Sequence, residues 1–231
     1  MVLGGLQKSS LIDYPGKVSS VAFFSGCNFD CPYCHNPDLA RGELTSRALD
    51  DRALIQFLSR RVGLIDGVVM SGGEPTLQNG LSRFCRKVKD MGFRVKEDTN
   101  GSRPAVLEQL LKDDVMDYVA MDIKTDPDNY GRLAKGASVS ADIKSSIRIV
   151  MAAGIDYEFR TTCVKPFVDE SIIRTIAHLI QGARLYALQR FREETLLHPD
   201  FFKEKPRRFD ESELSRFQSI AGSQVETCVV R

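Results

Sequence analysis

The sequence has no block of charges of one sign and no long apolar run. Its 231 residues carry 32 Lys and Arg against 31 Asp and Glu, a formal net charge of +1. Basic residues gather only over residues 203–208, where a glutamate interrupts them, so we interpret this segment as a solvated loop. No apolar run approaches the ~20 residues that span a bilayer. We therefore expect neither nucleic acid nor a membrane as a partner.

The N-terminus lacks a basic start, an apolar stretch and a small-residue cleavage site, so we expect no signal peptide. A cytoplasmic location follows, and thiols stay reduced there. The six cysteines then do not predict three disulfides. Three of them, Cys27, Cys31 and Cys34, lie within eight residues. Such close spacing indicates a role other than cross-linking.

Short β-branched or aromatic runs alternate with helical patterns along most of the chain. We expect strands over residues 18–24, 67–70, 93–97, 118–123, 155–164 and 184–189, and helices over 45–60 (capped by Thr45 or Ser46), 77–91, 104–111, 139–153 and 171–180. Such alternation predicts parallel strands joined by right-handed crossovers. Six units are too few for the usual eight-membered barrel. The predicted fold class is α/β, an incomplete (β/α)6 TIM-like barrel.

No linker or low-complexity stretch separates a second domain, so we expect a single domain over residues 1–231 with a core at about 17–191. The tail, 192–231, is polar until a helix at 211–221 and a final strand at 225–230. Neither the segment 3–15 nor the tail beyond Phe191 has the periodicity of a core element. Both are expected to dock a partner or to pack across the open ends of the barrel.

The cysteine motif Cys27-Asn-Phe-Asp-Cys31-Pro-Tyr-Cys34 directly follows the first predicted strand. Three thiolates this close can bind three corners of a cubane iron–sulfur cluster and leave one iron without a protein ligand. An open metal position is useful when another molecule binds there. The remaining cysteines, at 85, 163 and 228, lie in separate predicted elements.

Three alternatives to a catalytic cluster stay open for the motif. Zinc could bind the three cysteines and His35, but adjacent Cys34 and His35 would coordinate one ion awkwardly. His35 could complete a cluster, although histidine ligands raise the potential of two-iron clusters. The cysteines could also be close by chance. The spacing favours the catalytic cluster.

Polar residues mark the ends of the next strands. Gly72 and Gly73, in Ser-Gly-Gly-Glu-Pro, allow close backbone approach, and Glu74 or the adjoining backbone offers a polar edge. The segments 98–101 and 122–124 end two further strands, at the carboxyl edge where ligands bind in parallel α/β folds. Lys124 is a compact cation, whereas the aspartates that begin both segments are oxygen donors suited to a cation or to hydrogen bonds.

The cysteine spacing, Tyr33 before the last cysteine and the Gly-Gly-Glu element resemble the radical SAM superfamily. The resemblance implies a [4Fe–4S] cluster on Cys27, Cys31 and Cys34, with S-adenosylmethionine (SAM) chelating the fourth iron. Reductive cleavage of SAM would then give a 5′-deoxyadenosyl radical. It also implies SAM contacts from Tyr33, Gly72, Gly73, Glu74, Asp98, Thr99, Asp122, Lys124, Arg160 and Gln189, and a monovalent cation near Asp98 and Asp122.

The opening segment 4–16, Cys34-His-Asn-Pro37 and Leu188-Gln-Arg-Phe191 resemble one subgroup, the activating proteins of anaerobic ribonucleoside-triphosphate reductase. This implies an oxidoreductase that installs a glycyl radical on a partner enzyme and takes electrons from a low-potential donor such as flavodoxin or ferredoxin. The sequence departs from the subgroup at Glu97, over 165–167 and in the tail. Residues 38–66 contain no cysteine, so no ferredoxin insert is expected. The alternative is a radical SAM enzyme acting on a small molecule, such as a deazapurine-forming carboxylate synthase.

Overall fold

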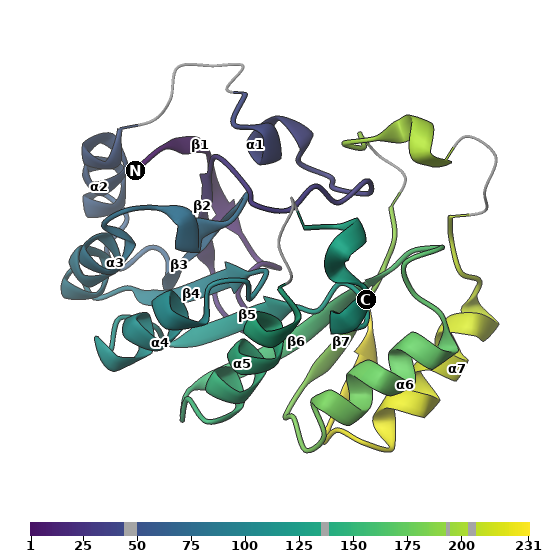
Figure 1. Cartoon of the computed structure of the whole chain (residues 1–231). Coiled ribbons are helices and arrows are strands. Elements are labelled where there is room, and N and C mark those ends of the chain that lie inside the picture. Colours follow the sequence, from purple (N-terminus) through teal and green to yellow (C-terminus); the bar gives the residue numbers. More distant parts are fainter. Residues whose placement is uncertain (44–49, 135–138, 193–194, 203–206) are drawn as a thin grey trace. The chain divides into compact units, whose positions relative to one another are not determined.

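The computed structural model describes residues 1–43, 50–134, 139–192, 195–202 and 207–231 (Figure 1). Its strands are β1 (Leu3–Ser10), β2 (Ser19–Phe24), β3 (Gly67–Gly72), β4 (Arg94–Thr99), β5 (Tyr118–Asp122), β6 (Asp156–Cys163), β7 (Tyr186–Arg190) and β8 (Cys228–Val230). Its α-helices are α1 (Pro37–Arg41), α2 (Asp51–Ser59), α3 (Leu81–Asp90), α4 (Pro104–Lys112), α5 (Ser140–Met151), α6 (Glu170–Leu179) and α7 (Glu211–Gly222). Three 3₁₀ helices complete the description: η1 (Pro75–Leu77), η2 (Pro127–Arg132) and η3 (Pro199–Phe202).

Strand order follows chain order from β1 to β8. Pairing is parallel between β2 and β3, β3 and β4, β6 and β7, and β7 and β8, whereas β1 runs antiparallel to β2. Each strand from β2 to β7 is followed by a helix before the next strand begins. The predicted open (β/α)6 arrangement is therefore observed. No helix of the described ranges is long and apolar enough to cross a bilayer.

Contacts divide the chain into two compact units. The first contains residues 1–28, 36–99 and 105–119, and the second contains 29–35, 100–104 and 120–231. The prediction of a single domain remains a prediction, and each unit is described separately below.

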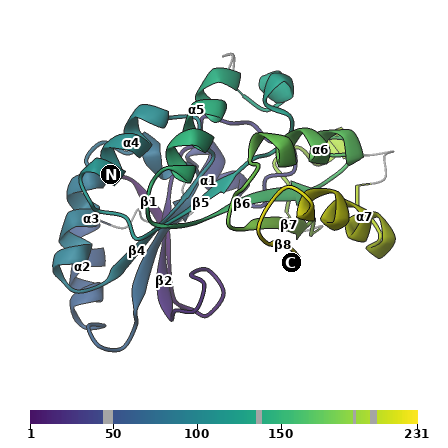
Figure 2. The same ribbon diagram turned by 90° about the horizontal axis from the view of Figure 1, so that it is seen from below.

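In the first unit, α2 and α3 lie along one face of the strands (Figure 2). Helix α3 buries Leu81, Phe84, Cys85 and Val88, which recur at helical spacing. The expected caps of the preceding helix, Thr45 and Ser46, lie outside the described residues. The described part of that helix begins at Asp51, after an Asp50 side chain that accepts the N–H of Arg52 at 2.8 Å.

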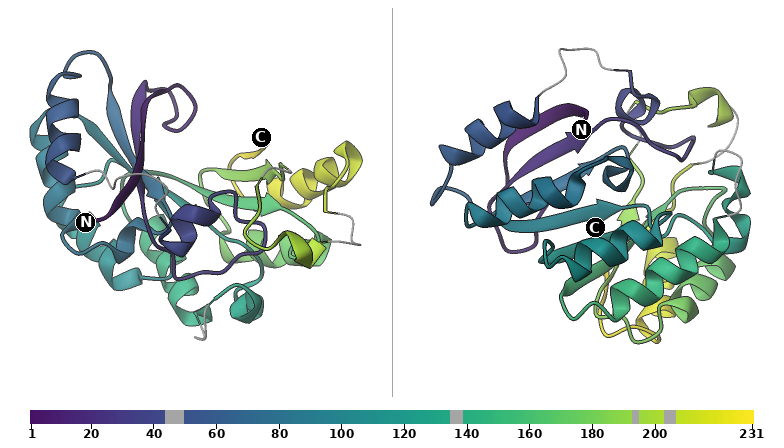
Figure 3. Two further views of the ribbon diagram at one scale, coloured as in Figure 1. Left: turned by 90° about the horizontal axis from the view of Figure 1, so that it is seen from above. Right: turned by 60° about the vertical axis from the view of Figure 1, so that its left-hand side comes forward.

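Strand β1 was not predicted. Leu3 is fully buried, but the following residues are glycine or polar apart from Leu6, and only Ser10 among them is buried, as suits an edge strand that pairs on one side only. The loop after it, which Figure 3 shows in purple, exposes Leu11 and Ile12. Most of the segment 3–15 is therefore part of the sheet.

In the second unit, α6 and α7 lie side by side (Figure 1). Helix α7 begins with a capping box, because Asp210 accepts the N–H of Glu213 while the Glu213 carboxylate accepts the N–H of Asp210. Leu214 and Phe217 face the core of this unit. The helix predicted at 211–221 is confirmed, and the final strand is shorter than predicted, at Cys228–Val230.

Candidate active site

The glycine turn after β3 packs directly on the backbone at the end of β2. Gly73 donates its N–H to the carbonyl oxygen of Phe24 at 2.8 Å, and Glu74 donates to that of Gly26 at 2.9 Å. A Cβ on Gly73 would lie 2.1 Å from the Gly26 oxygen, and one on Gly72 would lie 2.5 Å from backbone atoms of Phe24. Gly72 also has φ +112°. Both positions require glycine, and their close neighbour is the segment that leads into the first cysteine.

Backbone hydrogen bonds hold this segment from α1 as well. Gly26 donates to the carbonyl oxygen of Leu39 at 2.7 Å, and Cys27 donates to that of Ala40 at 3.1 Å. Cys27 is half-buried. Its position in the first unit is therefore fixed by main-chain contacts to two elements.

The Glu74 carboxylate is engaged inside the protein. Its side chain is 1% exposed, and Oε1 accepts hydrogen bonds from the Thr76 N–H at 3.2 Å, the Thr76 hydroxyl and the Thr99 hydroxyl at 2.8 Å. Either the Glu74 carboxylate or the adjoining backbone was expected to offer a polar edge to a ligand. The carboxylate instead links the turn to Thr99 at the end of β4. The polar edge that remains on the turn is backbone.

Successive side chains of β4 point to opposite faces of the sheet. Thr99 binds Glu74 on one face, and on the other Asp98 forms an ion pair with the buried Lys96. Glu97 is fully buried, and neither of its carboxylate oxygens has a hydrogen-bond partner among the described residues. Burial raises the pKa of Glu97 well above its usual value, and the nearby carboxylates of Glu74 and Asp98 raise it further.

The boundary between the two units falls inside the cysteine motif, after residue 28. Cys27 belongs to the first unit, and Cys31 and Cys34 belong to the second. Within the second unit, Cys34 donates its N–H to the Cys31 oxygen at 2.9 Å, which closes a tight turn between these two thiols. Asp30 donates its N–H to the Leu133 oxygen at 2.7 Å and ties the loop to the end of η2.

Aromatic side chains pack against this cysteine loop. The ring of Tyr33 lies 5.2 Å from that of Phe167, centre to centre, and His35 lies 5.5 Å from Phe191. Phe167 in turn stacks on Phe201 at 5.4 Å. These distances are typical of favourable aromatic pairs. Phe191 and Phe201 come from the segment that follows β7.

The same segment makes polar contacts with the loop. His198 donates its N–H to the Pro32 oxygen at 3.1 Å, and its Nε2 lies 3.0 Å from a carboxylate oxygen of Asp30. Phe202 is 1% exposed and stacks on Phe191. Among the described residues of this segment, Phe191 and His198 therefore pack on the cysteine loop. Docking of a partner by the tail stays a prediction.

Three charged side chains meet near the carboxyl ends of β5 and β6. Asp122 accepts the Nε–H of Arg160 at 2.8 Å and lies 3.3 Å from Lys124 Nζ. Burial would raise the pKa of Asp122, but Arg160 and Lys124 outweigh it and lower the pKa to about 2. Asp122 is therefore a carboxylate throughout the physiological pH range.

Lys124 stays charged for the complementary reason. Burial would lower its pKa, but the neighbouring Asp122 carboxylate outweighs that effect and raises the pKa well above its usual value. Its backbone N–H is fixed by a 2.8 Å hydrogen bond to the hydroxyl of Tyr130. Two cations thus share one carboxylate, which leaves the cluster of charges positive.

Two further predicted residues belong to the second unit. Tyr33 is buried, and its hydroxyl has no hydrogen-bond partner among the described residues. Burial raises the pKa of Tyr33 well above its usual value, so the hydroxyl is neutral. Gln189 is half-buried near the end of β7, in register with Thr162 of β6.

The six cysteines are thiols that form no disulfide with one another. Among the described residues, no three His, Cys, Asp or Glu side chains are gathered so that they could hold one metal ion. A cubane cluster makes a different demand, because each cysteine binds a separate iron. Three thiols within eight residues of the sequence match that demand. Within the second unit, Cys31 and Tyr33 lie close enough to Lys124 to interact with its charge.

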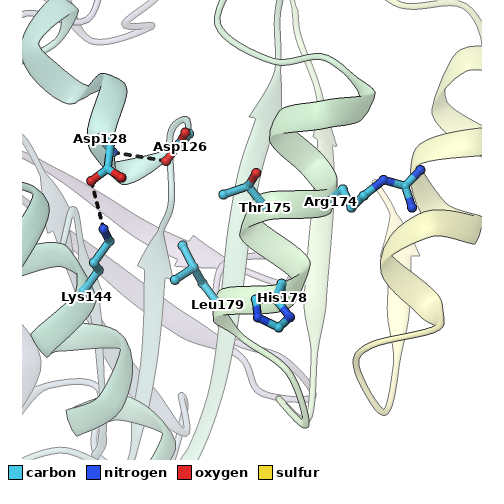
Figure 4. Close-up of a pocket in the computed structure, with 7 residues that line it drawn as sticks. All are labelled: Asp126, Asp128, Lys144, Arg174, Thr175, His178 and Leu179. Carbon is cyan, nitrogen blue, oxygen red and sulfur yellow. Dashed lines mark hydrogen bonds and ion pairs between the residues drawn. The ribbon is translucent and has the colours of Figure 1, made fainter.

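The pocket drawn in Figure 4 lies elsewhere in the second unit. Its volume is about 400 Å³. It is lined by residues of α5, α6 and the start of η2: Asp126, Asp128, Lys144, Arg174, Thr175, His178 and Leu179. Asp128 pairs with Lys144 across it, whereas Arg174 points away from the aspartates. None of the predicted site residues lines this pocket. The volume of a pocket therefore does not by itself identify the active site of this protein.

The sequence matches a family model for the radical SAM superfamily over residues 21–179. The chain belongs to the radical SAM superfamily. Membership makes it a radical SAM enzyme and implies a [4Fe–4S] cluster and SAM as cofactors. The matched range begins in β2 and ends with α6, so it contains the cysteine motif and most of the predicted site residues.

Relatives cover the whole chain. A Methanocaldococcus jannaschii protein, named by inference as a glycyl-radical enzyme activating enzyme, is 37% identical over all of this chain and 95% of its own length. The pyruvate formate-lyase-activating enzyme of Clostridium pasteurianum is 33% identical over 80% of this chain and 79% of that enzyme. A 7-carboxy-7-deazaguanine synthase of Methanopyrus kandleri is 29% identical over 48% of this chain and 51% of its own.

A solved structure supports the fold. Streptococcus suis SuiB, crystallised with S-adenosylmethionine, matches 91% of this chain with a TM-score of 0.65 and 11% identity. This chain spans about half, 51%, of the SuiB chain. At that identity the likeness concerns architecture alone, and it confirms the predicted incomplete barrel of the radical SAM type.

Sequence reasoning missed three features of these groups. It gave Lys96 no role, although a lysine two residues before Asp98 on one strand must share its face. It assigned the glycines to ligand approach and did not foresee contact with the chain's own backbone. It also left the aromatic residues of the tail without a partner, because a contact such as that of Phe191 with His35, far apart in the sequence, carries no local signal.

Proposed function

We propose that this protein is a glycyl radical enzyme activase, which cleaves SAM reductively at a [4Fe–4S] cluster and installs a glycyl radical on a partner enzyme. The observation that carries the proposal is the similarity to an activating enzyme along the entire chain, at 37% identity. The similarity to the pyruvate formate-lyase-activating enzyme supports the same class.

Cys27, Cys31 and Cys34 would hold the cluster. When bound, it would supply the electron that splits the sulfonium of SAM. The chain's own contribution is to place and shield the thiols. Backbone contacts from α1 and the glycine turn fix Cys27, whereas Tyr33 and the aromatic tail pack on the loop that carries the other two.

The SAM contacts are assigned by charge. Lys124 would bind the SAM carboxylate, with Arg160 holding Asp122 beside it. Gly72, Gly73 and the backbone at Glu74 would offer acceptors to the SAM ammonium. Four further residues would provide hydrogen bonds to SAM: Asp98 and Thr99 at the end of β4, Tyr33 through its hydroxyl and Gln189 through its amide. Three of these groups are neutral, and the charge of Asp98 is already paired with Lys96.

The expected monovalent cation near Asp98 and Asp122 gains little support. Asp98 already pairs with Lys96, and Asp122 pairs with both Lys124 and Arg160. Each carboxylate therefore faces a protein cation, which reduces its attraction for an ion from solution.

The proposed partner is anaerobic ribonucleoside-triphosphate reductase, with flavodoxin or ferredoxin as electron donor in the cytoplasm. Support comes from the resemblance of the opening segment 4–16 and of Leu188-Gln-Arg-Phe191 to that subgroup. Chemistry on a small molecule is the second candidate, and the deazaguanine synthase relative favours it over only 48% of this chain.

Incubation of the reduced, cluster-loaded protein with SAM and one glycyl radical enzyme at a time tests the proposal. Electron spin resonance should show a glycine-centred doublet with the reductase and none when Cys31→Ala replaces the native protein. A doublet with pyruvate formate-lyase instead would still support a glycyl radical enzyme activase, with pyruvate formate-lyase rather than the reductase as its partner. SAM cleavage with turnover of a deazapurine precursor and no protein radical would overturn the proposal.

A further inference from the structure

Lys96 is a buried lysine in the middle of a strand. Its side chain is 1% exposed, and it is among the largest fully buried side chains of the described residues. Its ammonium pairs with a carboxylate oxygen of Asp98, two positions along β4 on the same face. The ammonium also lies 5.8 Å from the centre of the Tyr118 ring, which packs on Tyr14.

Burial of a charged ammonium is tolerated only with compensation. An unpaired ion in a protein interior is strongly unfavourable, whereas an ion pair with good hydrogen-bond geometry recovers most of the loss. The face of Tyr118 adds a second favourable interaction, because the aromatic ring presents negative charge to a cation. Asp98 is itself only 13% exposed, so the two charges stabilise each other away from bulk water.

The neighbouring carboxylate shows that this compensation is specific. Glu97 lies between Lys96 and Asp98 but points to the opposite face, and its oxygens have no hydrogen-bond partner in the described part of the chain. Burial raises the pKa of Glu97 and favours its neutral form, so this carboxyl is not held by a hydrogen-bonded cation of the described residues. The lysine is directed at one carboxylate, the one that faces the same side of the sheet.

We propose that the Lys96 ammonium is a built-in counter-cation for Asp98, standing where a monovalent cation would otherwise be needed. The inference rests on the proposed function only in treating Asp98 as part of the SAM site. A protein ammonium and a potassium ion both carry one positive charge and are attracted to carboxylate oxygens. The covalent ammonium is always present, so the enzyme works independently of monovalent cations in solution. Asp98 then offers SAM a hydrogen bond rather than an uncompensated negative charge.

Three variants separate charge from packing. Lys96→Met removes the charge and fills the space, Lys96→Ala removes the charge and leaves room for an ion, and Lys96→Met with Asp98→Asn removes both charges. Lys112→Met is the control, because that lysine is exposed in an i,i+4 pair. Each protein is measured in KCl and in choline chloride at equal ionic strength, for its melting temperature without SAM and for SAM affinity with the cluster loaded.

The native protein should show the same melting temperature and SAM affinity in both salts. In choline chloride, Lys96→Met and Lys96→Ala should melt about 6 °C or more below it, because each removes the cation that compensates a largely buried carboxylate. Potassium should restore part of the loss in Lys96→Ala and none in Lys96→Met. The double variant should recover most of the stability, and Lys112→Met should match the native protein.

Several results would overturn the inference. One is a saturable dependence of the native enzyme on potassium or sodium; others are full stability of Lys96→Met in choline chloride, or a double variant no more stable than the single. Failure of potassium to restore Lys96→Ala would overturn it too. Lys96→Ala could also lose stability and regain it with potassium while its SAM affinity stays unchanged. That result would support the role of Lys96 as a counter-cation and would remove Asp98 from the residues assigned to SAM binding.

Discussion

The candidate residues of the two units are built in different ways. In the first unit, Cys27, Gly72 and Gly73 are placed by main-chain contacts, and the Glu74 carboxylate is engaged inside the fold. In the second, Asp122, Lys124 and Arg160 act through charge, and their backbone could carry other side chains. Substitutions in the first group should therefore damage the fold and the cluster together, whereas those in the second should damage SAM binding alone.

Two carboxylates sharpen the same contrast. Asp122, with two cations, has a pKa lowered to about 2, whereas Glu97, with no hydrogen-bond partner among the described residues, has a pKa raised by burial. The first is stabilising as an anion, and the second costs free energy when charged. Burial by itself does not mark a functional carboxylate; its compensation does.

The largest effect is expected from Gly73→Ala. The added Cβ would lie 2.1 Å from the Gly26 oxygen, so the backbone before Cys27 must move. We expect a loss of about 3 kcal/mol of stability, with cluster content and SAM cleavage lost together. Calorimetry and iron analysis would measure both.

Gly131→Ala is the matched control, because a Cβ there has no atom within 4 Å and should change little. A Gly73→Ala protein that keeps its cluster but binds SAM weakly would break the comparison. The glycine would then serve the ligand rather than the fold.

A smaller effect is expected from Lys124→Ala. A charge-assisted hydrogen bond contributes about 1.5–3 kcal/mol, so SAM affinity should fall roughly ten- to a hundredfold. Cluster content should be unchanged, because Lys124 acts through its side chain. Titration with SAM measures the affinity, and Lys144→Ala, which removes a partly exposed ion pair with Asp128, is the control. Unchanged affinity would give Lys124 a structural role.

The smallest effect is a gain. Glu97→Leu removes a buried carboxyl whose oxygens are unsatisfied in the described structure, a group that costs about 1–3 kcal/mol. Because burial raises the pKa of Glu97, the folded state binds a proton that the unfolded chain releases above about pH 4.3. Native stability from this group is present below that pH and is lost as pH rises through the folded pKa.

Glu97→Leu should therefore raise the melting temperature more at pH 8 than at pH 5. The Asp122 contribution has the opposite sign: it is present above about pH 4 and is lost as pH falls toward 2. Melting curves across this range separate the two. A Glu97→Leu protein less stable than the native one at pH 8 would show that the Glu97 carboxylate stabilises the fold, contrary to this expectation.

Much of the fold was predictable from the sequence. The six strands from β2 to β7 are buried runs with clear helical segments between them, so period and composition located them within a few residues. β1 was missed because only one of its edges pairs and only Leu3 is deeply buried among its apolar residues, which leaves no alternation to detect.

Some of the candidate residues were likewise predictable from the sequence, and others were not. Motifs at strand ends identified Asp122 and Lys124, because the carboxyl edge of a parallel sheet is a fixed location. The packing of Phe191 and Phe202 near the cysteine loop could not be predicted, since those residues are far from the motif in sequence. Lys96 was hidden for another reason: a lysine in a strand normally indicates a solvent-facing position.

The central claim is that three cysteines of one loop hold the cluster at which SAM is cleaved. Its most direct test compares Cys31→Ala with Cys163→Ala, since both thiols are buried and only the first belongs to the motif. Anaerobically reconstituted Cys163→Ala should retain about four iron atoms per chain and SAM cleavage, whereas Cys31→Ala should lose both. A Cys31→Ala protein that keeps its iron and still cleaves SAM would contradict the claim.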